Sequence, residues 1–205
     1  KNSKHDSFHL PCHKAHSLMN KRVLIVGCGD LGLKVGKLLA QAADITCWGV
    51  RRSPPAQNTI DRFEWVAADV TQPQTLKSLP ENITDIIYCA APGQRTEEAY
   101  NAVYFEGLKN VVNAVNLSTV KRIVFISSTA VYGDHGDDWI DENTPTDPKA
   151  FNGRILVQTE QWLTTLSAAH AGLRTISLRL SGIYGPGRNH LLERLKKGLA
   201  SAPTD

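Results

Sequence analysis

The stretch Arg22–Gly32, RVLIVGCGDLG, constrains the fold more than any other part of the chain. Its first five residues suit a buried parallel strand, and Gly27, Gly29 and Gly32 then follow in the pattern G-x-G-x-x-G, before a helical pattern over 33–42. In this setting the first glycine permits a tight turn, the second lets backbone approach a pyrophosphate, and the third lets helix and strand pack closely. The helix N-terminus also favours an anion. The pattern predicts a dinucleotide-binding turn, with an ordinary glycine-rich turn as the alternative.

Composition excludes several classes of protein. The 205 residues are enough for one domain with a substantial core, and 41% hydrophobic with 21% charged residues is typical of soluble globular proteins. A net charge of +3 is too small to indicate nucleic acid or a membrane surface as a partner. No apolar run approaches the roughly 20 residues that a membrane span needs. Four cysteines without paired spacing favour a reducing cytoplasm.

The first 18 residues hold four of the seven histidines and show neither periodicity nor the apolar segment of a signal peptide. We predict a disordered extension over 1–18 and one nucleotide-binding domain over 19–205. The spacing of His9, Cys12, His13 and His16 would suit a metal, but metal sites usually present their ligands from a folded frame. We therefore expect no metal, and a metal site in this extension is the less favoured alternative.

Apolar stretches alternate with helical patterns along the rest of the chain. The expected strands cover 22–26, 45–50, 63–67, 85–90, 122–127 and 174–180, and the expected helices cover 33–42, 97–116, 153–170 and 191–200. Such alternation predicts a parallel sheet covered on both faces. Because crossovers are right-handed, the expected α/β topology is a doubly wound parallel sheet with flanking helices, a Rossmann fold that binds NAD(P).

The residues after the second and third expected strands bear on the choice of nucleotide. NAD-binding proteins usually place an acidic residue after the second strand to hold the ribose hydroxyls, but here Arg51 and Arg52 stand there. Because guanidinium groups attract a 2′-phosphate, we expect NADP(H) to be favoured over NAD(H), with two solvated arginines as the alternative. After the third strand, Asp69 and Val70 are placed to reach an adenine, although Asp69 could instead cap the next turn.

The fifth expected strand runs into SSTAVYGD, over 127–134. This segment resembles the S-S-x-x-V-Y-G signature of the extended short-chain dehydrogenases/reductases, the NAD-dependent epimerase/dehydratase family. Further segments resemble the family's motifs in the same order: Ala90-Ala91, GLKN over 107–110, DENTP over 141–145, Leu178-Arg179 and YGPG over 184–187. The resemblance covers Lys21 to about Arg188. It implies an oxidoreductase that moves hydride between NAD(P) and a carbonyl or alcohol, with a sugar-like substrate as one candidate.

The resemblance also implies roles for individual residues. Ser128 would position a substrate oxygen, and Tyr184 and Arg188 would border the substrate pocket. On the cofactor side, the resemblance and the glycine pattern together place Gly27, Gly29, Asp30, Leu31, Gly32, Arg51, Arg52, Asp69, Val70, Ala90, Ala91 and Ser127.

The chain departs from the family at the catalytic pair. The family's Y-x-x-x-K motif supplies a tyrosine as general acid/base and a lysine that lowers its pKa. Counting back from Glu160 places Asn152 at the tyrosine position and Leu156 at the lysine position. An amide hydrogen-bonds but cannot give up a proton as a phenol does. Tyr104 stands where a family helix carries an asparagine.

Three classes of function therefore remain open. The first is an oxidoreductase of the epimerase/dehydratase type, in which Tyr132 or Tyr184 would replace the missing acid, although packing is the favoured role of both. The second is a non-catalytic NAD(P)-binding sensor or regulatory protein, and the third is an inactive fragment. Because little chain follows YGPG, we expect the smaller C-terminal substrate domain to be largely missing. The expected partners are a dinucleotide and a small-molecule substrate, and a homodimer is a candidate assembly.

Overall fold

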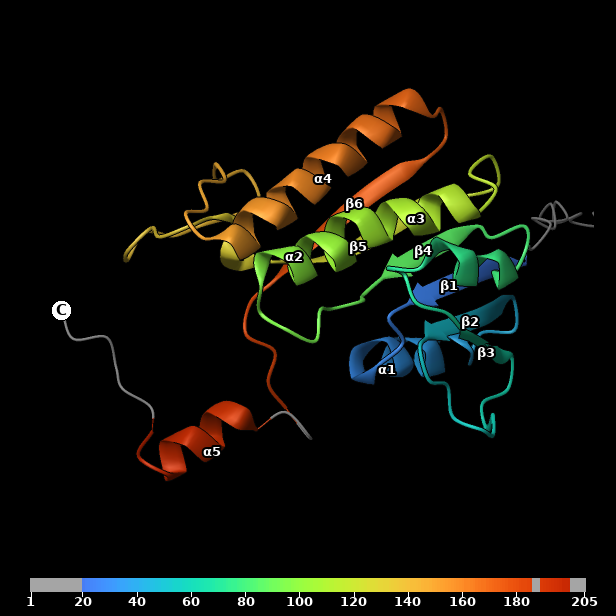
Figure 1. Ribbon diagram of the computed structural model, residues 1–205, viewed down its shortest axis with the longest axis horizontal. Coiled ribbons are helices and arrows are strands. Elements are labelled where there is room, and N and C mark those ends of the chain that lie inside the picture. Colours follow the sequence, from blue (N-terminus) through green and yellow to red (C-terminus); the bar gives the residue numbers. More distant parts are fainter. Residues whose placement is uncertain (1–19, 186–188, 200–205) are drawn as a thin grey trace, which may run out of the picture.

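Six parallel strands form one sheet in the order β3-β2-β1-β4-β5-β6, as Figure 1 shows. The computed structural model describes residues 20–185 and 189–199, so the expected extension over 1–18, with its histidines and Cys12, lies outside the described residues. The strands are β1 (Lys21–Val26), β2 (Ile45–Arg51), β3 (Phe63–Ala67), β4 (Asp85–Tyr88), β5 (Arg122–Ser128) and β6 (Arg174–Leu180). The predicted doubly wound α/β fold is confirmed.

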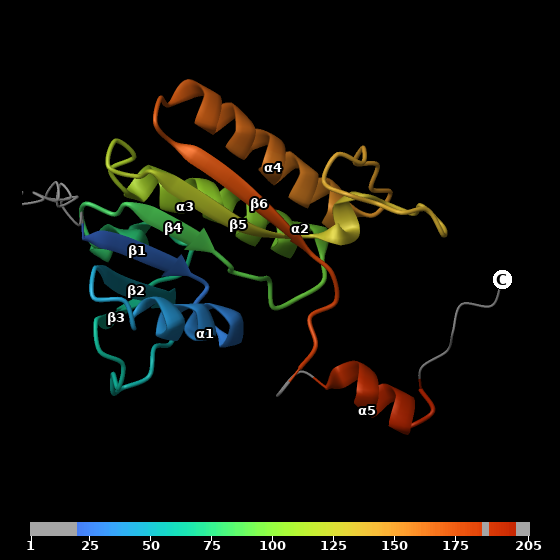
Figure 2. The ribbon, with the colours of Figure 1, turned by 180° about the vertical axis from the view of Figure 1, so that it is seen from behind.

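Helices cover both faces of the sheet. They are α1 (Asp30–Leu39), α2 (Glu97–Tyr100), α3 (Gly107–Ala114), α4 (Phe151–Ala169) and α5 (His190–Lys196), with short helical segments η1 (Pro73–Ser78), η2 (Asn101–Glu106) and η3 (Thr129–Val131). Figures 1 and 2 show α1 on the opposite face of the sheet from α3 and α4. This division follows from right-handed crossovers, because β1 to β3 and β4 to β6 run outward in opposite directions from the middle of the sheet.

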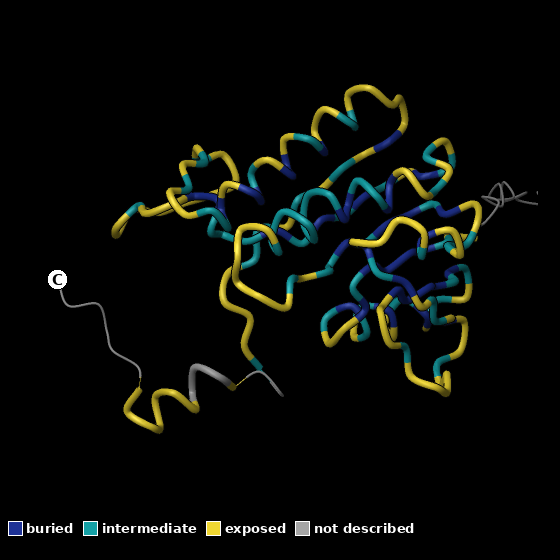
Figure 3. The backbone as a smooth tube through the Cα atoms, viewed as in Figure 1, coloured by how far each residue is buried: buried dark blue, intermediate teal, exposed yellow. Residues whose placement is uncertain are grey.

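Alternation along the strands divides the core in two. On β1, Leu24 and Val26 pack into the cluster under α3 and α4, whereas Val23 and Ile25 pack into a smaller cluster under α1. Figure 3 shows the buried residues concentrated in the central strands. The outer strand β6 is less covered, and Ile176 on that strand is 41% exposed.

The helix predicted over 97–116 differs from the structure in its middle. Between α2 and α3, the segment η2 is π-helical. The hydroxyl of Tyr88, at the end of β4, donates to the carbonyl oxygen of Val103 at 2.5 Å. A Cβ on Gly107 would lie 2.8 Å from that hydroxyl, so the glycine makes room for it. The π-helical segment therefore packs around a residue of a neighbouring strand, a contact which the helical periodicity could not reveal.

The remaining differences lie at element ends. Helix α1 begins at Asp30 and not at 33, because the first turn of the helix follows directly on Gly29. Strand β4 ends at Tyr88 and not at 90, since the chain turns there to pass close to Gly27. The short helix η1, which begins at Pro73, was not predicted. These differences do not change the order or direction of the strands.

Candidate functional site

The three glycines of the turn after β1 meet three different surroundings. Gly27 has φ +78°, and a Cβ there would lie 2.2 Å from the backbone of Ala90. A Cβ on Gly32 would lie 2.9 Å from the Sγ of Cys89, so this glycine lets α1 approach the sheet. At Gly29 the nearest atom would be 4.0 Å away. Gly27 and Gly32 therefore allow close packing within the protein, whereas the space beside Gly29 is open to a ligand.

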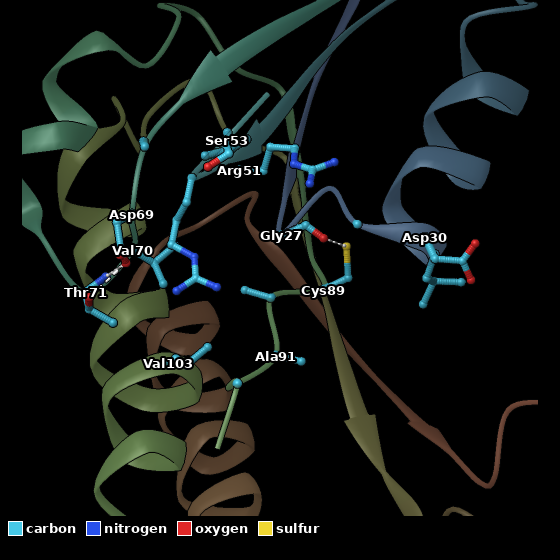
Figure 4. A pocket seen from close by; sticks show the side chains of 17 residues that line it. Gly27, Asp30, Arg51, Ser53, Asp69, Val70, Thr71, Cys89, Ala91 and Val103 are labelled. Carbon is cyan, nitrogen blue, oxygen red and sulfur yellow. Dashed lines mark hydrogen bonds between the residues drawn. The ribbon is translucent and has the colours of Figure 1, made fainter. Parts of the chain in front are cut away.

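The amino end of α1 faces the same space. Within the described residues no side chain caps this end of the helix, so the N–H groups of Leu31 and Gly32 are left for an anion. Asp30, in the first turn, forms an ion pair with Lys34 at 3.0 Å. Figure 4 shows its side chain away from Gly27 and from the opposite wall of the cavity.

A cavity of about 460 Å³ opens at the carboxyl ends of the strands, beside this turn (Figure 4). Its lining includes ten of the residues predicted to bind a cofactor, namely Gly27, Gly29, Asp30, Leu31, Arg51, Arg52, Asp69, Val70, Ala90 and Ala91. In an open α/β sheet, ligands bind at this edge, where the strand order reverses. Residues that the sequence did not point to, Ser53, Thr71, Gly93 and Val103, complete much of the wall.

The polar groups of this cavity come from the ends of β2 and β3. The Oδ1 of Asp69 accepts hydrogen bonds from the backbone N–H of Thr71 at 2.9 Å and from its hydroxyl at 2.8 Å, so Asp69 caps the turn while it lines the cavity. Arg51 and Arg52 are exposed. Across the described residues, neither arginine forms an ion pair, although the Arg51 guanidinium lies 6.0 Å from the centre of the Trp65 ring. Both cations therefore remain available to a charged ligand.

A second cavity, of about 240 Å³, continues from the first toward β5 and β6. The two share Leu31, Cys89, Ala90 and Ala91. The second cavity adds Ser127 and Ser128 together with Tyr104, Leu156, Ile126, Leu180, Ser181 and Ile183. The two adjoining cavities, together termed the groove, extend from the glycine turn to the serine pair.

The two serines make different hydrogen bonds. Ser127 donates to the Oε1 of Glu160 at 2.6 Å, and both groups are buried. The Oγ of Ser128 accepts from the backbone N–H of Ala130 at 3.2 Å, so its own proton can still be donated to a ligand. Of the pair, Ser128 is therefore the better placed to hold a substrate oxygen.

The positions of the family's catalytic pair lie in the first turns of α4. Leu156 is 3% exposed and forms part of the wall of the second cavity, so an apolar side chain stands where the resemblance expects a cation. Asn152 is half-buried and lines neither cavity. The second cavity thus lacks the tyrosine–lysine pair, and what polar chemistry it offers comes from other elements.

A polar network beside the serine pair joins four segments, namely the end of β5, the residues around Tyr132, α4 and β6. Arg179 on β6 donates to Glu160 on α4 at 2.8 and 3.1 Å, and also to the Tyr132 hydroxyl at 3.0 Å. The hydrogen bonds and charge of Glu160 raise the pKa of Arg179 above its ordinary value. Tyr132 is 5% exposed and lines neither cavity, so packing and this hydrogen bond account for its position. The geometry does not bring Tyr132 into the second cavity.

Of the two substrate residues implied by the resemblance, the structure describes only Tyr184. Tyr184 is 85% exposed and lines neither cavity, and Arg188 lies outside the described residues. Tyr184 therefore supplies no buried acid at Ser128.

The thiols of the described chain are protonated at neutral pH. Cys28, Cys47 and Cys89 are free, and burial raises the pKa of Cys28 and Cys47 to about 11 and that of Cys89 to about 12. Because the thiolate is the nucleophile, none of them is activated. In the described ranges there is no cluster of three or more histidine, cysteine or acidic side chains that could hold a metal, and no helix is long and apolar enough to cross a membrane.

Comparison with known proteins agrees with this geometry. Residues 23–202 match the family model described as the NAD dependent epimerase/dehydratase family, and the chain belongs to that family. Among curated proteins it is similar to protein YeeZ of Escherichia coli strain K12, with 29% identity over 179 residues, which cover 82% of this chain and 61% of YeeZ. The chain therefore spans about 60% of the length of this relative.

Solved structures show the same fold. A structure from Methylobacillus flagellatus, assigned to the NAD-dependent epimerase/dehydratases, is 34% identical with a TM-score of 0.67, over 87% of this chain and 60% of that one. The Bordetella bronchiseptica enzyme WbmH in complex with NAD+ is 18% identical with a TM-score of 0.66, over 87% of this chain and 63% of that one. At that identity, WbmH supports the fold alone.

Proposed function

We propose that the chain binds a nicotinamide dinucleotide along the groove and acts as an NAD(P)-dependent oxidoreductase of the epimerase/dehydratase type. One observation carries the proposal. Gly27 and Gly32 are packed tightly against the protein, whereas a Cβ on Gly29 would meet no atom nearer than 4.0 Å. The turn is therefore closed toward the core and open toward the cavity, as a pyrophosphate on a helix N-terminus requires.

The residues around the turn fit the rest of a dinucleotide. The adenine half would lie by Asp69 and Val70, and the nicotinamide half would reach the second cavity past Ala90 and Ala91. When bound, the dinucleotide supplies the hydride donor or acceptor of the reaction. Ser128 would donate a hydrogen bond to the oxygen of a carbonyl or alcohol substrate. Asn152 would be a further hydrogen-bonding group at the start of α4, and Tyr184 and Arg188 would contact the substrate.

We further propose that NADP(H) is favoured over NAD(H). Arg51 and Arg52 both border the first cavity, and neither is neutralised by an acidic partner in the described chain. A guanidinium group binds a phosphate through several N–H donors, which a ribose hydroxyl cannot match. A homodimer, a cytoplasmic location and a sugar-like substrate remain predictions from the sequence.

Calorimetric titration with NADPH and NADH tests the binding. The variant Gly29→Ala adds a methyl group on the open side of the turn, so we expect the fold to persist and the nucleotide affinity to fall about 100-fold, equivalent to about 2.7 kcal/mol. Gly182→Ala is the matched control, because a Cβ there has no atom within 4 Å and Gly182 lines neither cavity. Equal nucleotide binding by wild type and Gly29→Ala would contradict the proposed position of the pyrophosphate.

A non-catalytic nucleotide-binding protein is a second candidate, favoured by the apolar Leu156 at the reaction end. The two candidates differ in one measurement. A catalyst oxidises NADPH when a carbonyl compound is added, whereas a sensor binds NADPH and leaves its absorbance unchanged under the same conditions.

A further inference from the structure

The second cavity contains one phenol. Tyr104 lines it together with Ser128 and Leu156, and the residue comes from η2, on a different helix from the family's catalytic pair. The hydroxyl of Tyr104 forms no hydrogen bond with any residue within 20–185 or 189–199. In these ranges every buried side-chain polar atom has a hydrogen-bond partner, so an unpartnered hydroxyl is not buried. The hydroxyl of Tyr104 is therefore accessible to solvent, and Tyr104 is one of the residues that line the second cavity.

The fold holds the Tyr104 ring from two sides. Its centre lies 5.3 Å from that of Tyr100 and 6.1 Å from that of Phe125, both in tilted or edge-to-face arrangements that favour aromatic pairs. The preceding residue, Val103, is tied to β4 by the Tyr88 hydroxyl. Contacts from β4 and β5 thus fix the π-helical turn that carries Tyr104, and such turns are frequent at functional sites.

We propose that Tyr104 is the general acid that serves a carbonyl substrate held by Ser128, in the place left by the absent tyrosine of Y-x-x-x-K. This inference rests on the proposed oxidoreductase function. In the step, the carbonyl carbon receives a hydride from the reduced nicotinamide, and the carbonyl oxygen takes the phenolic proton of Tyr104. The substrate becomes an alcohol, the nicotinamide is oxidised, and water returns a proton to the phenolate.

The ionisation of the phenol agrees with this direction of transfer. Burial, and then the neighbouring Tyr100, raise the pKa of Tyr104 to about 12. With Leu156 where a lysine would lower the pKa, Tyr104 stays protonated at neutral pH. It can therefore donate a proton to an alkoxide, which is a stronger base than a phenolate, and it is poorly suited to remove a proton from an alcohol. At neutral pH the site therefore holds the protonation state that carbonyl reduction requires.

Tyr104→Phe in the full chain tests the role. With NADPH and a panel of aldehydes headed by para-nitrobenzaldehyde and glyceraldehyde, we expect kcat to fall about 100-fold and KM to change little. Tyr100→Phe is the matched control, since it removes a hydroxyl four residues earlier from a ring that lines neither cavity. Unfolding midpoints and NADPH affinity should be unchanged in both variants. Equal kcat loss in the two variants, or none in Tyr104→Phe, would overturn the proposal.

A binding measurement gives a readout that does not need turnover. Isobutyramide is an unreactive amide whose carbonyl oxygen accepts a hydrogen bond as a substrate would. By calorimetry in the presence of NADPH, its affinity should fall about fivefold in Tyr104→Phe, the size of one hydrogen bond, and stay constant in Tyr100→Phe.

The outcomes separate this inference from the proposed function. If wild type binds no NADPH, the nucleotide-binding function itself is wrong. If it binds NADPH but reduces no aldehyde and shows no difference between variants in isobutyramide binding, nucleotide binding stands and the acid role of Tyr104 is wrong.

Discussion

The two ends of the groove are built on different principles. At the end beside the glycine turn, which we propose as the nucleotide end, Gly27 and Gly32 pack closely as the glycine pattern predicts, and Gly29 faces open space. This surface is formed by backbone, with no side chains at the three glycines. At the other end, which we propose as the reaction end, Ser128 lines the wall, Leu156 stands where the resemblance expects a cation, and the phenol of Tyr104 comes from another helical segment. A backbone surface is tied to the fold that forms it, whereas side-chain chemistry can change position on an unchanged fold.

The largest expected effect lies at the nucleotide end. Gly27→Ala would place a Cβ 2.2 Å from the Ala90 backbone at φ +78°, so both steric overlap and left-handed strain oppose it. We expect a loss of about 4 kcal/mol in the free energy of unfolding, together with loss of nucleotide binding. Urea denaturation followed by circular dichroism measures it. If Gly27→Ala is as stable as Gly182→Ala, the nucleotide end does not depend on backbone fit, and the comparison fails.

The next effect tests whether the reaction end is held by side chains. Glu160→Ala leaves the Arg179 guanidinium without its carboxylate and removes the acceptor of Ser127. Because this pair is largely buried, we expect the free energy of unfolding to fall by about 3 kcal/mol.

A milder variant of the same network serves as its control. Ser127→Ala removes one hydrogen bond and leaves the ion pair, so it should cost about 1 kcal/mol. In both variants NADPH affinity should fall much less than in Gly29→Ala, since neither touches the glycine turn, although Ser127 lines the second cavity. A parallel fall in NADPH affinity would show that the two ends are coupled and not separate.

The smallest effect concerns the choice of nucleotide. In the double variant Arg51→Glu with Arg52→Ala, NADPH affinity should fall about tenfold relative to NADH, equivalent to about 1.4 kcal/mol. Arg174→Glu with Lys121→Ala changes the net charge equally, on exposed residues of the opposite edge of the strands. Calorimetry at constant ionic strength compares the two. If the ratio of NADPH to NADH affinity shifts equally in both double variants, the net charge of the protein, and not a contact with the 2′-phosphate, explains the difference between the nucleotides.

The sequence predicted the features that depend on residues close together in the chain. The six strands and the glycine turn could be found because apolar alternation and the G-x-G-x-x-G spacing each lie within about ten residues of sequence. The position of Tyr104 could not, because it lies on a π-helical segment in which the carbonyl of Val103 accepts a hydrogen bond from Tyr88, 15 residues before Val103 in the chain. The one available signal was that Tyr104 stands where the family carries asparagine.

The sequence pattern could not predict the polar network around Glu160 and Arg179 either. Ser127 and Glu160 are 33 residues apart, and Tyr132 and Arg179 are 47 apart. Each pair meets only because β5, α4 and β6 come together in the fold. The sequence favoured packing over catalysis for Tyr132, and its burial agrees, but its partner could not be named from spacing.

The contact between Gly27 and Ala90 also bears on how nucleotide-binding turns are recognised and transplanted. The glycine fingerprint is usually read from one strand and one helix, yet here its first glycine touches backbone that follows β4, 63 residues later. A change in the path of this backbone would crowd or open the turn while leaving G-x-G-x-x-G intact in the sequence. A search pattern for such sites, or a loop graft intended to create one, should therefore carry both segments as a single unit.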